Sequence, residues 1–356
     1  MPRLLFFFMA FAWQLPLPAT LAQDPDHVPW LQDVEWKSET GPATDELTKM
    51  RDLKSWEMQR QQWLDAWRDF LGPAPKGAEA FDTQLVSEDS VDGVVRRRIR
   101  YRNEVDDWME AYLLIPQARI ESGDKGPAIV ALHPTTNETI SEMVGLSGRD
   151  GRENGLQLAR HGYVVLCPTN FLWQQPGGFE AAVQRYQDRH PRSLGMAKML
   201  FDAQRAVDFL IAEPHVDRQK IGAFGHSLGA KETWFLTALD SRIQAAVASE
   251  GGIAWDSTNW DAPWYLGPEI RSPDCPRKPH QLLALAAPRP LLILGGQSGP
   301  GAADGTQSLP WIEAAAPAWH LHGQPFGFGL WNHRRGHTLD AQMMERVVAW
   351  FDCYLQ

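Results

Sequence analysis

A serine stands between glycines in the pentapeptide Gly-His-Ser-Leu-Gly at residues 225–229. The mostly apolar residues 221–224 precede it, and a helix-compatible run begins at Ala230. A Gly-x-Ser-x-Gly sequence between a strand and a helix is typical of a sharp turn that exposes the serine hydroxyl beside the start of the helix. We therefore predict that Ser227 is a nucleophile.

A serine hydroxyl needs a general base at neutral pH, and in this strand-turn-helix arrangement the base is a histidine late in the chain. His337 follows Gly336 in such a position, and His333 is a rival four residues earlier. The two histidines lack the His-Glu-x-x-His pattern of a zinc-binding helix. We favour His337 as the base, place His333 in its surroundings, and predict neither a metal nor another cofactor.

The histidine needs a carboxylate that holds its tautomer and stabilises the imidazolium. Asp304 lies in a glycine-rich loop after the apolar residues 291–294, which is the usual position of this acid. Glu250 ends the preceding apolar run, 245–249, and would lie at the same edge of a sheet. We favour Asp304 as the acid, with Glu250 sharing or taking its role.

Attack of a serine on a carbonyl group creates an oxyanion, which two backbone N–H groups should stabilise. One donor belongs to the residue after the nucleophile, Leu228, and the other to the loop that follows residues 128–132. Pro134 has no N–H, so Thr135 is the first donor beyond it. Leu228 and Thr135 are the predicted oxyanion donors.

From residue 128 onward, short apolar runs alternate with amphipathic stretches, which predicts the α/β fold class with a buried, mostly parallel sheet flanked by helices. The expected strands are 128–132, 163–167, 221–224, 245–249 and 291–294. The expected helices are 152–161, 194–213, 230–239, 280–286, 309–315 and 339–354. His320 and His322 stand in a strand-like stretch and are expected to be structural.

The preceding residues indicate a different arrangement. Apolar residues recur at helical spacing over residues 44–71, which predicts an N-terminal helix that packs on the domain. Residues 81–88, 93–103 and 108–115 are rich in β-forming residues and predict an antiparallel meander at one edge of the sheet.

The first 22 residues combine an arginine near the start, an apolar run shorter than the roughly 20 residues of a membrane span, and small residues before Gln23. They predict a signal peptide, and hence a secreted or periplasmic protein without a stable membrane span after cleavage. An anchor that is not cleaved is the alternative. Residues 23–80 are interpreted as an accessory helical segment and residues 81–356 as the catalytic domain.

Charge and cysteine content exclude two classes of protein. The chain has 356 residues and a formal net charge of -10, so its average field repels nucleic acid, which is not an expected partner. The 3 cysteines are scattered and lack Cys-x-x-Cys spacing, so they form no disulfide framework.

With these segments in place, the chain resembles bacterial dienelactone-hydrolase-like and acetyl-xylan-esterase-like serine esterases. The resemblance runs from Trp56 to the C-terminus and rests on residues 225–229, 240–243, 287–291 and 336–337. It implies the α/β-hydrolase fold and cleavage of carboxylic esters through a Ser-His-Asp/Glu triad.

Glucuronoyl esterases offer a second, partial likeness. They carry a lysine four residues after the serine and a glutamate that closes the next strand, and Lys231 and Glu250 match these positions. Leu228 departs from the pattern, because glucuronoyl esterases have an arginine there. The resemblance implies an esterase directed at carbohydrates, in which Lys231 either contacts substrate or faces solvent.

The long segment 251–281 contains Trp255, Trp260 and Trp264 amid prolines and turn residues. Indole rings stack on sugars and offer an N–H donor, so we expect these tryptophans to line the substrate pocket. The expected partner is a carbohydrate or small-molecule ester. A serine peptidase on the same fold and a non-catalytic binding protein are the alternatives.

Overall fold

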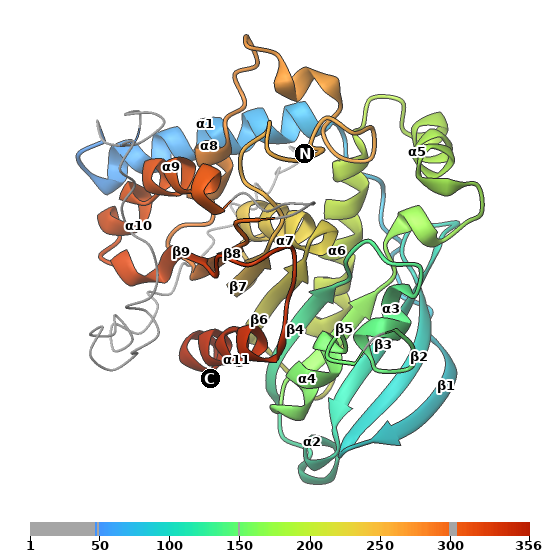
Figure 1. Ribbon diagram of the computed structural model, residues 1–356. Coiled ribbons are helices and arrows are strands. Elements are labelled where there is room, and N and C mark those ends of the chain that lie inside the picture. The colour runs from blue at the N-terminus through green and yellow to red at the C-terminus, as the bar shows by residue number, and fades with distance from the viewer. Residues whose placement is uncertain (1–46, 48–49, 149, 299–304) are drawn as a thin grey trace, which may run out of the picture.

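One sheet organises the part of the molecule that the structure describes (Figure 1). The computed structural model describes residue 47 and residues 50–148, 150–298 and 305–356, and within these the strand order is β1-β2-β3-β5-β4-β6-β7-β8-β9. The strands are β1 (Gln84–Val91), β2 (Val94–Arg102), β3 (Trp108–Pro116), β4 (Gly126–Leu132), β5 (Val164–Pro168), β6 (Val216–His226), β7 (Ile243–Ser249), β8 (Leu291–Gly295) and β9 (Phe328–Asn332). The strands expected at residues 128–132, 163–167, 221–224, 245–249 and 291–294 and the three stretches of the expected meander are all present.

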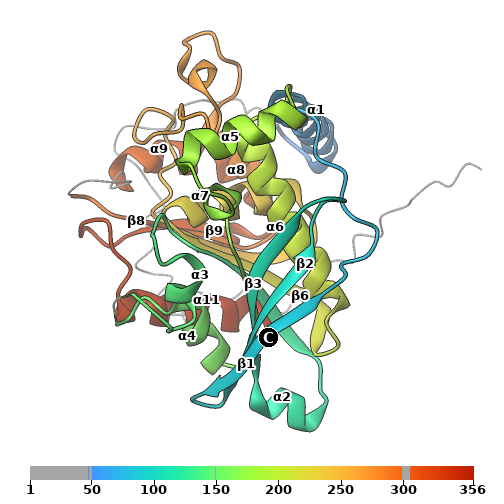
Figure 2. The same cartoon turned by 90° about the vertical axis from the view of Figure 1, so that its right-hand side faces the viewer.

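Strand pairing divides the sheet into two parts. β1, β2 and β3 pair antiparallel with one another, and β3 pairs antiparallel with β5. From β5 across β4, β6, β7 and β8 to β9, all neighbours are parallel. The predicted mostly parallel sheet with an antiparallel meander at one edge is therefore confirmed, and Figure 2 shows the meander from its own side.

Helices cover both faces of the parallel part (Figures 1 and 2). On one face, α6 (Gly195–Ala212), α7 (Leu228–Leu239) and α9 (Gly305–Ala315) pack on the strands. Further helices pack on these and add residues to the same core: α1 (Leu53–Leu71), α5 (Gly178–Arg189), α8 (Pro279–Ala284) and α10 (Pro317–Leu321). The other face is covered by α3 (Thr139–Met143), α4 (Asn154–Arg160) and α11 (Ala341–Leu355). The described residues also form the short elements α2 (Gln117–Ser122), η5 (Phe171–Trp173), η6 (Pro268–Arg271) and η7 (Pro325–Gly327).

The two helical layers explain why the central strands are apolar throughout. In β4, Ala128, Val130 and Leu132 belong to the core under the first layer, whereas Ile129 and Ala131 belong to the core under the second. Successive side chains of a strand point to opposite faces, so a strand covered on both sides needs apolar residues at every position. Such strands give the continuous apolar runs seen in the sequence.

The N-terminal helix α1 shares the core of the domain. Asp52 caps it, because its side chain accepts a hydrogen bond from the N–H of Ser55 at 2.8 Å. Trp56, Trp63 and Trp67 are buried, and the Trp67 ring meets Phe235 of α7 edge-on at 5.8 Å. The helix begins at Leu53, later than the expected residue 44, because Asp52 provides the N-cap.

Three features differ from the expectations. His320 lies in α10 and His322 caps it, so the predicted strand there is wrong; Pro317 at the first helical position favours the helix. The strand β9 follows this helix and was not expected, because Gly329 lies in its short sequence. The helix α5 was also missed, since it begins at Gly178, directly after Pro176 and Gly177, and buries few side chains.

The predicted signal peptide and residues 23–46, 48 and 49 of the accessory segment lie outside the described residues, as does Asp304. Among the helices that the structure does describe, none has the length and apolar character needed to cross a membrane. Cys167, Cys275 and Cys353 are free, in agreement with the sequence prediction.

Candidate active site

The sharp turn between β6 and α7 presents Ser227. Its backbone has φ 58° and ψ -116°, in a region that residues with side chains rarely adopt. A Cβ atom on Gly225 would lie 2.2 Å from the backbone of Gly229, and one on Gly229 would lie 2.1 Å from the carbonyl oxygen of Leu132. Both positions therefore require glycine, which accounts for the spacing of the pentapeptide.

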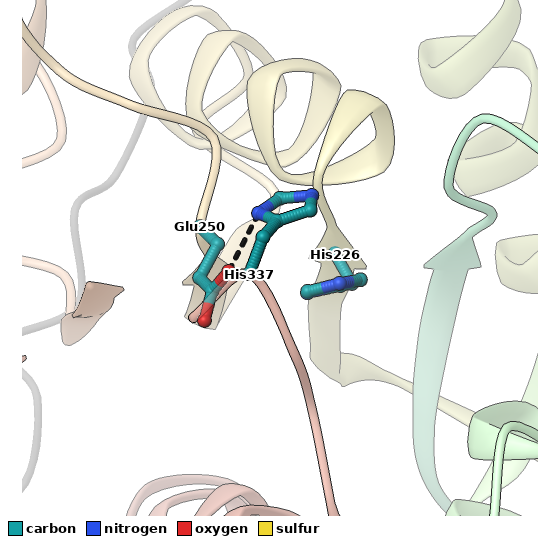
Figure 3. Close-up of side chains that lie close together, drawn as sticks. All are labelled: His226, Glu250 and His337. Carbon is teal, nitrogen blue, oxygen red and sulfur yellow. Dashed lines mark ion pairs between the residues drawn. The ribbon is translucent and has the colours of Figure 1, made fainter. Parts of the chain in front are cut away.

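His337 connects this serine to a carboxylate. Its Nε2 lies 2.9 Å from the Oγ of Ser227, and its Nδ1 lies 2.6 Å from the Oε2 of Glu250. Figure 3 shows the imidazole facing Glu250 across this second contact. If the hydroxyl donates to Nε2, the ring proton is on Nδ1, the nitrogen that lies beside the carboxylate. The hydroxyl, the imidazole and the carboxylate thus lie in sequence, so that His337 can take the serine proton next to a negative charge.

The Glu250 carboxylate is buried but well supplied with donors. Its backbone follows β7 with φ 56°, and its side chain is 0% exposed. Oε1 accepts hydrogen bonds from the Nε2 of His333 and, at 3.2 Å, from the N–H of Thr338. Burial acts to raise the pKa of Glu250, but hydrogen bonds from His333 and His337 outweigh it and hold that pKa below its ordinary value. The carboxylate is therefore ionised at neutral pH.

His226 lies beneath the imidazole of His337. The two rings stack with centroids 4.9 Å apart and planes inclined by 25°. Figure 3 shows His226 next to His337, on the side away from Glu250. Burial, reinforced by the nearby His337, lowers the pKa of His226 to about 3, so this ring is neutral. Its Nδ1 lies 3.1 Å from the Oγ of Ser249. A neutral ring at this position adds no charge that would oppose protonation of His337.

The same residues are the strongest candidate metal ligands in the described part of the chain. Ligand atoms of His226, Glu250 and His337 all lie within 4.8 Å of one another. The lone pairs of an imidazole lie in the plane of its ring, so two stacked rings do not aim at one ion between them. Metal binding would require one ring to turn, whereas the contacts to Ser227 and Glu250 require no movement.

The loop predicted to supply the second oxyanion donor packs against the first turn of α7. The oxygen atoms of Leu132 and His133 are the nearest neighbours of a Cβ built on Gly229. Thr135 follows in this loop and is exposed. Leu228 is the first residue of α7, and its N–H therefore has no acceptor within the helix. The fold brings the two predicted donors to the same edge of the sheet.

A buried network holds that loop in place. The Nε2 of His133 accepts a hydrogen bond from the N–H of Asn170 at 3.0 Å, and its Nδ1 donates to the carbonyl of Pro134 at 2.8 Å. Burial lowers the pKa of His133 to about 4, so the ring is neutral. The Asn170 amide donates to Glu232 of α7 at 2.9 Å. Loop and nucleophile helix are therefore joined through Asn170.

Sequence comparison assigns the region that contains this site. Residues 109–280, from β3 to α8, match the dienelactone hydrolase family. This region is a dienelactone hydrolase family domain. A stretch of 154 residues, 41% of the chain, is also 27% identical to dipeptidyl-peptidase 5 of Porphyromonas gingivalis, but it spans only 21% of that protein.

Solved structures share the fold of this hydrolase domain. A glucuronoyl esterase from Solibacter usitatus aligns with a TM-score of 0.67 at 17% identity, over 85% of this chain and 94% of its own. An acetyl xylan esterase structure from Bacteroides fragilis aligns with a TM-score of 0.61 at 14% identity, over 92% of this chain and 88% of its own. The α/β-hydrolase fold expected from the sequence is thereby confirmed.

Two of the predicted substrate-binding tryptophans lie in the interior of the hydrolase domain. Trp260 is 0% exposed and Trp255 is 8% exposed, and both pack on Trp234. Their N–H groups donate to the carbonyls of Gly252 and Arg277. Because both rings are buried among other side chains, neither can stack on a sugar in this structure. The expectation that they line the pocket is corrected to a role in the core.

Lys231 faces the same aromatic cluster. Its ammonium lies 3.8 Å from the centroid of the Trp260 ring and 2.5 Å from the Oγ1 of Thr258, and the residue is 4% exposed. A cation over an indole face is stabilised by the ring quadrupole. Of the two alternatives left open by the sequence, the solvent-facing lysine is excluded, and contact with substrate stays a prediction.

Trp264 is the predicted binding residue that keeps an accessible edge. It is half-buried and meets Phe179 at 5.4 Å, and Phe179 meets Trp173 at 4.6 Å. Trp173 in turn contacts the ring of His133 at 5.0 Å. These three partly exposed rings run from segment 251–281 to the loop that carries Thr135.

Residues outside the recognised motifs also support the site. Asn170 and Glu232 brace the loop, and His333 supports Glu250 from the side opposite His337. The sequence indicated only that His333 belongs near the base. Asp304, the favoured acid, lies outside the described residues, whereas Glu250 directly contacts His337, the predicted base.

Proposed function

We propose that the chain is a serine ester hydrolase in which Ser227 is the nucleophile, His337 the general base and Glu250 the triad acid. The dienelactone hydrolase family domain and the α/β-hydrolase fold support an ester hydrolase. The observation that carries the serine mechanism is the unbroken path from Ser227 through His337 to Glu250, with contacts of 2.9 and 2.6 Å.

The proposed reaction is acyl transfer in two steps. The Oγ of Ser227 attacks the ester carbonyl carbon while its proton passes to the Nε2 of His337. That proton then goes to the leaving alcohol as the C–O bond of the ester breaks, which leaves an acyl-enzyme. Water attacks the acyl carbon, His337 accepts its proton, and the proton returns to Ser227 as the acid product departs. Glu250 stabilises the imidazolium in both steps.

The oxyanion of each step is assigned to the N–H groups of Leu228 and Thr135. Removal of one such donor typically costs about 3 to 4 kcal/mol of transition-state stabilisation. The Asn170 network supports this assignment, because it holds the loop that bears Thr135 against the helix that bears Leu228.

Carbohydrate or small-molecule esters are the proposed substrates. The similar structures are a glucuronoyl esterase and an acetyl xylan esterase, and the partly exposed rings of Trp173, Phe179 and Trp264 suit a sugar. Leu228 offers no charge to the oxyanion, unlike the arginine of glucuronoyl esterases. A screen of acetylated xylan, glucuronate methyl ester and short nitrophenyl esters distinguishes these classes.

A peptidase is the second candidate, because part of the chain is 27% identical to a dipeptidyl-peptidase. Hydrolysis of aminoacyl nitroanilides in preference to nitrophenyl esters would favour the peptidase.

A non-catalytic binding protein is the third candidate, although the side chains of the proposed nucleophile, base and carboxylate are in contact. Secretion is proposed on the leader-like residues 1–22 alone.

The test of the mechanism is hydrolysis of p-nitrophenyl acetate by variants of the triad. Ser227→Ala and His337→Ala should each lose on the order of 10⁶-fold in kcat, as in other serine hydrolases, and should remain folded. Ser241→Ala, a change at an exposed serine, is the matched control and should keep parental activity. A parental rate for Ser227→Ala would refute the mechanism.

A further inference from the structure

Glu250 has a second histidine on the side opposite His337. We propose that His333 is a positioning residue that keeps Glu250 ionised and aimed at His337, so that the serine is activated at neutral pH. This role rests on the proposed function, because it acts through the triad and not on substrate.

The position of His333 is set by the end of β9. Its N–H donates to the carbonyl of Gly295 at the end of β8, at 3.0 Å. Its side chain is 2% exposed, and its ring meets that of Trp331 edge-on at 6.0 Å. A buried ring between two strand ends has few alternative rotamers, so it can hold a partner in a defined place.

The turn after β9 determines which nitrogen of His333 carries the proton. Arg334 has φ 60°, and its N–H donates to the Oδ1 of Asn332 at 2.9 Å. This bend returns the N–H of Arg335 to the Nδ1 of His333, at 3.2 Å. Since Nδ1 accepts, the neutral ring is protonated at Nε2, and that N–H donates to the Oε1 of Glu250.

The hydrogen bond from His333 offsets the burial of the carboxylate. Desolvation acts most strongly on the pKa of Glu250 and would raise it; the hydrogen bond from His333 is the largest opposing effect. Oε1 also accepts from Thr338, and Oε2 faces His337. His333 and Thr338 together occupy one oxygen, which leaves the other directed at the base.

His333 is not an alternative base. Its Nε2 faces Glu250 and its Nδ1 faces a backbone N–H, whereas the contact to the Oγ of Ser227 comes from His337. Its effect on the serine must therefore pass through Glu250.

The test is the rate at which a fluorophosphonate probe labels Ser227, measured from about pH 5 to about pH 9. His333→Leu removes the donor, whereas His333→Gln keeps an N–H₂ group near the position of Nε2. We expect His333→Leu to lower the plateau rate about 10- to 100-fold, the factor that a hydrogen bond to a charged group contributes. The acid limb of the pH profile of this variant should move to higher pH. Without the donor from His333, the Glu250–His337 pair holds its proton more tightly.

The plateau labelling rate of His333→Gln should stay within about threefold of the parental rate, which is less than the factor that a full hydrogen bond contributes. The acid limb of its pH profile should coincide with that of the parent. The surface variant His161→Leu is the control for loss of a histidine and should match the parent. Thermal unfolding of each variant separates misfolding from the proposed effect. The proposal would be overturned if His333→Leu and His333→Gln lost the same factor in labelling rate and neither shifted the acid limb of the pH profile. It would also be overturned if both variants had the labelling rate and pH profile of the parent.

A double-mutant cycle shows whether the effect passes through Glu250. In a Glu250→Gln background, adding His333→Leu should cause no further loss in labelling rate. A double variant whose loss equals the product of the two single losses would contradict the proposal. Failure of the proposed function itself looks different, because Ser227→Ala would then be labelled as fast as the parent.

Discussion

Glu250 and Glu232 are two buried glutamates whose surroundings drive their pKa values in opposite directions. They are 0% and 3% exposed. Burial would raise the pKa of Glu250, but hydrogen bonds from two imidazoles hold it below its ordinary value. Burial raises the pKa of Glu232 well above its ordinary value, and the hydrogen bond from Asn170 opposes only part of that rise. The number and kind of donors, rather than burial, decide which carboxylate is charged.

The difference matches the role that we propose for each region. A triad needs a negative charge beside the imidazole, and the region around Glu250 supplies several donors to maintain it. The region around Glu232 needs only to connect the oxyanion loop to α7, and a neutral carboxylic acid makes that hydrogen bond without the cost of a buried charge. Each prediction below changes one side of this comparison.

The largest effect is expected from Glu250→Gln. It removes the charge that stabilises the His337 imidazolium, so kcat should fall on the order of 10⁴-fold, as when other triads lose their acid. Asp304→Asn is the matched variant of the residue favoured by the sequence, and we now expect it to cause the smaller loss. Hydrolysis of p-nitrophenyl acetate by both variants measures the ratio; a larger loss in Asp304→Asn would assign the role to that residue.

An intermediate effect is expected from Asn170→Leu. It leaves the Oε1 of Glu232 without the amide donor and removes the side-chain bond to the N–H of Leu172. A buried polar group without its partner typically costs about 1 to 3 kcal/mol, so the free energy of unfolding should fall by that amount. Urea denaturation gives the value. An unchanged midpoint and slope would show that this network contributes nothing to stability.

The smallest effect is expected from Glu232→Gln, which keeps a neutral group of similar shape. Because the folded-state pKa of Glu232 is raised, its stabilising contribution is complete below the unfolded-state pKa and is lost as pH rises through the folded-state pKa. The Gln variant should therefore match the parent near pH 4 and exceed it in Tm at higher pH, by about 2 to 4 °C per kcal/mol.

Glu250→Gln should show the opposite pH dependence of stability. The lowered pKa of Glu250 contributes stability above the unfolded-state pKa, and this contribution is lost as pH falls through the folded-state pKa. The parent should therefore exceed this variant in Tm at neutral pH and lose that advantage in acid. Calorimetry of both variants over the same pH range checks the contrast, and parallel curves would contradict it.

The sequence predicted most of the parallel strands and the sharp turn that presents Ser227, because both are local patterns. A strand covered on both sides must be apolar over several residues. The close backbone approach at Gly225 and Gly229 requires glycine at both positions, which produces the recognisable pentapeptide 225–229. The strand-like alternation around His320 and His322 was misleading, because Pro317 starts a helix there.

The contacts of Glu250 with His333 and His337 could not be predicted with the same certainty, because they depend on which strand ends meet. Glu250 follows β7, while His333 and His337 follow β9, a strand that the sequence did not predict. Trp255 and Trp260 show a related difficulty. Tryptophans in a loop are easily interpreted as binding residues when their neighbours in the fold are unknown. In this structure their neighbours include other buried rings.

The central claim is that one serine is activated by the His337–Glu250 pair, and mapping the adduct of a fluorophosphonate tests it most directly. Peptide mass spectrometry of the labelled protein should find the phosphonyl group on Ser227 alone, with labelling strongly reduced in His337→Ala. An adduct on another residue, or equal labelling of Ser227 in His337→Ala, would contradict the account.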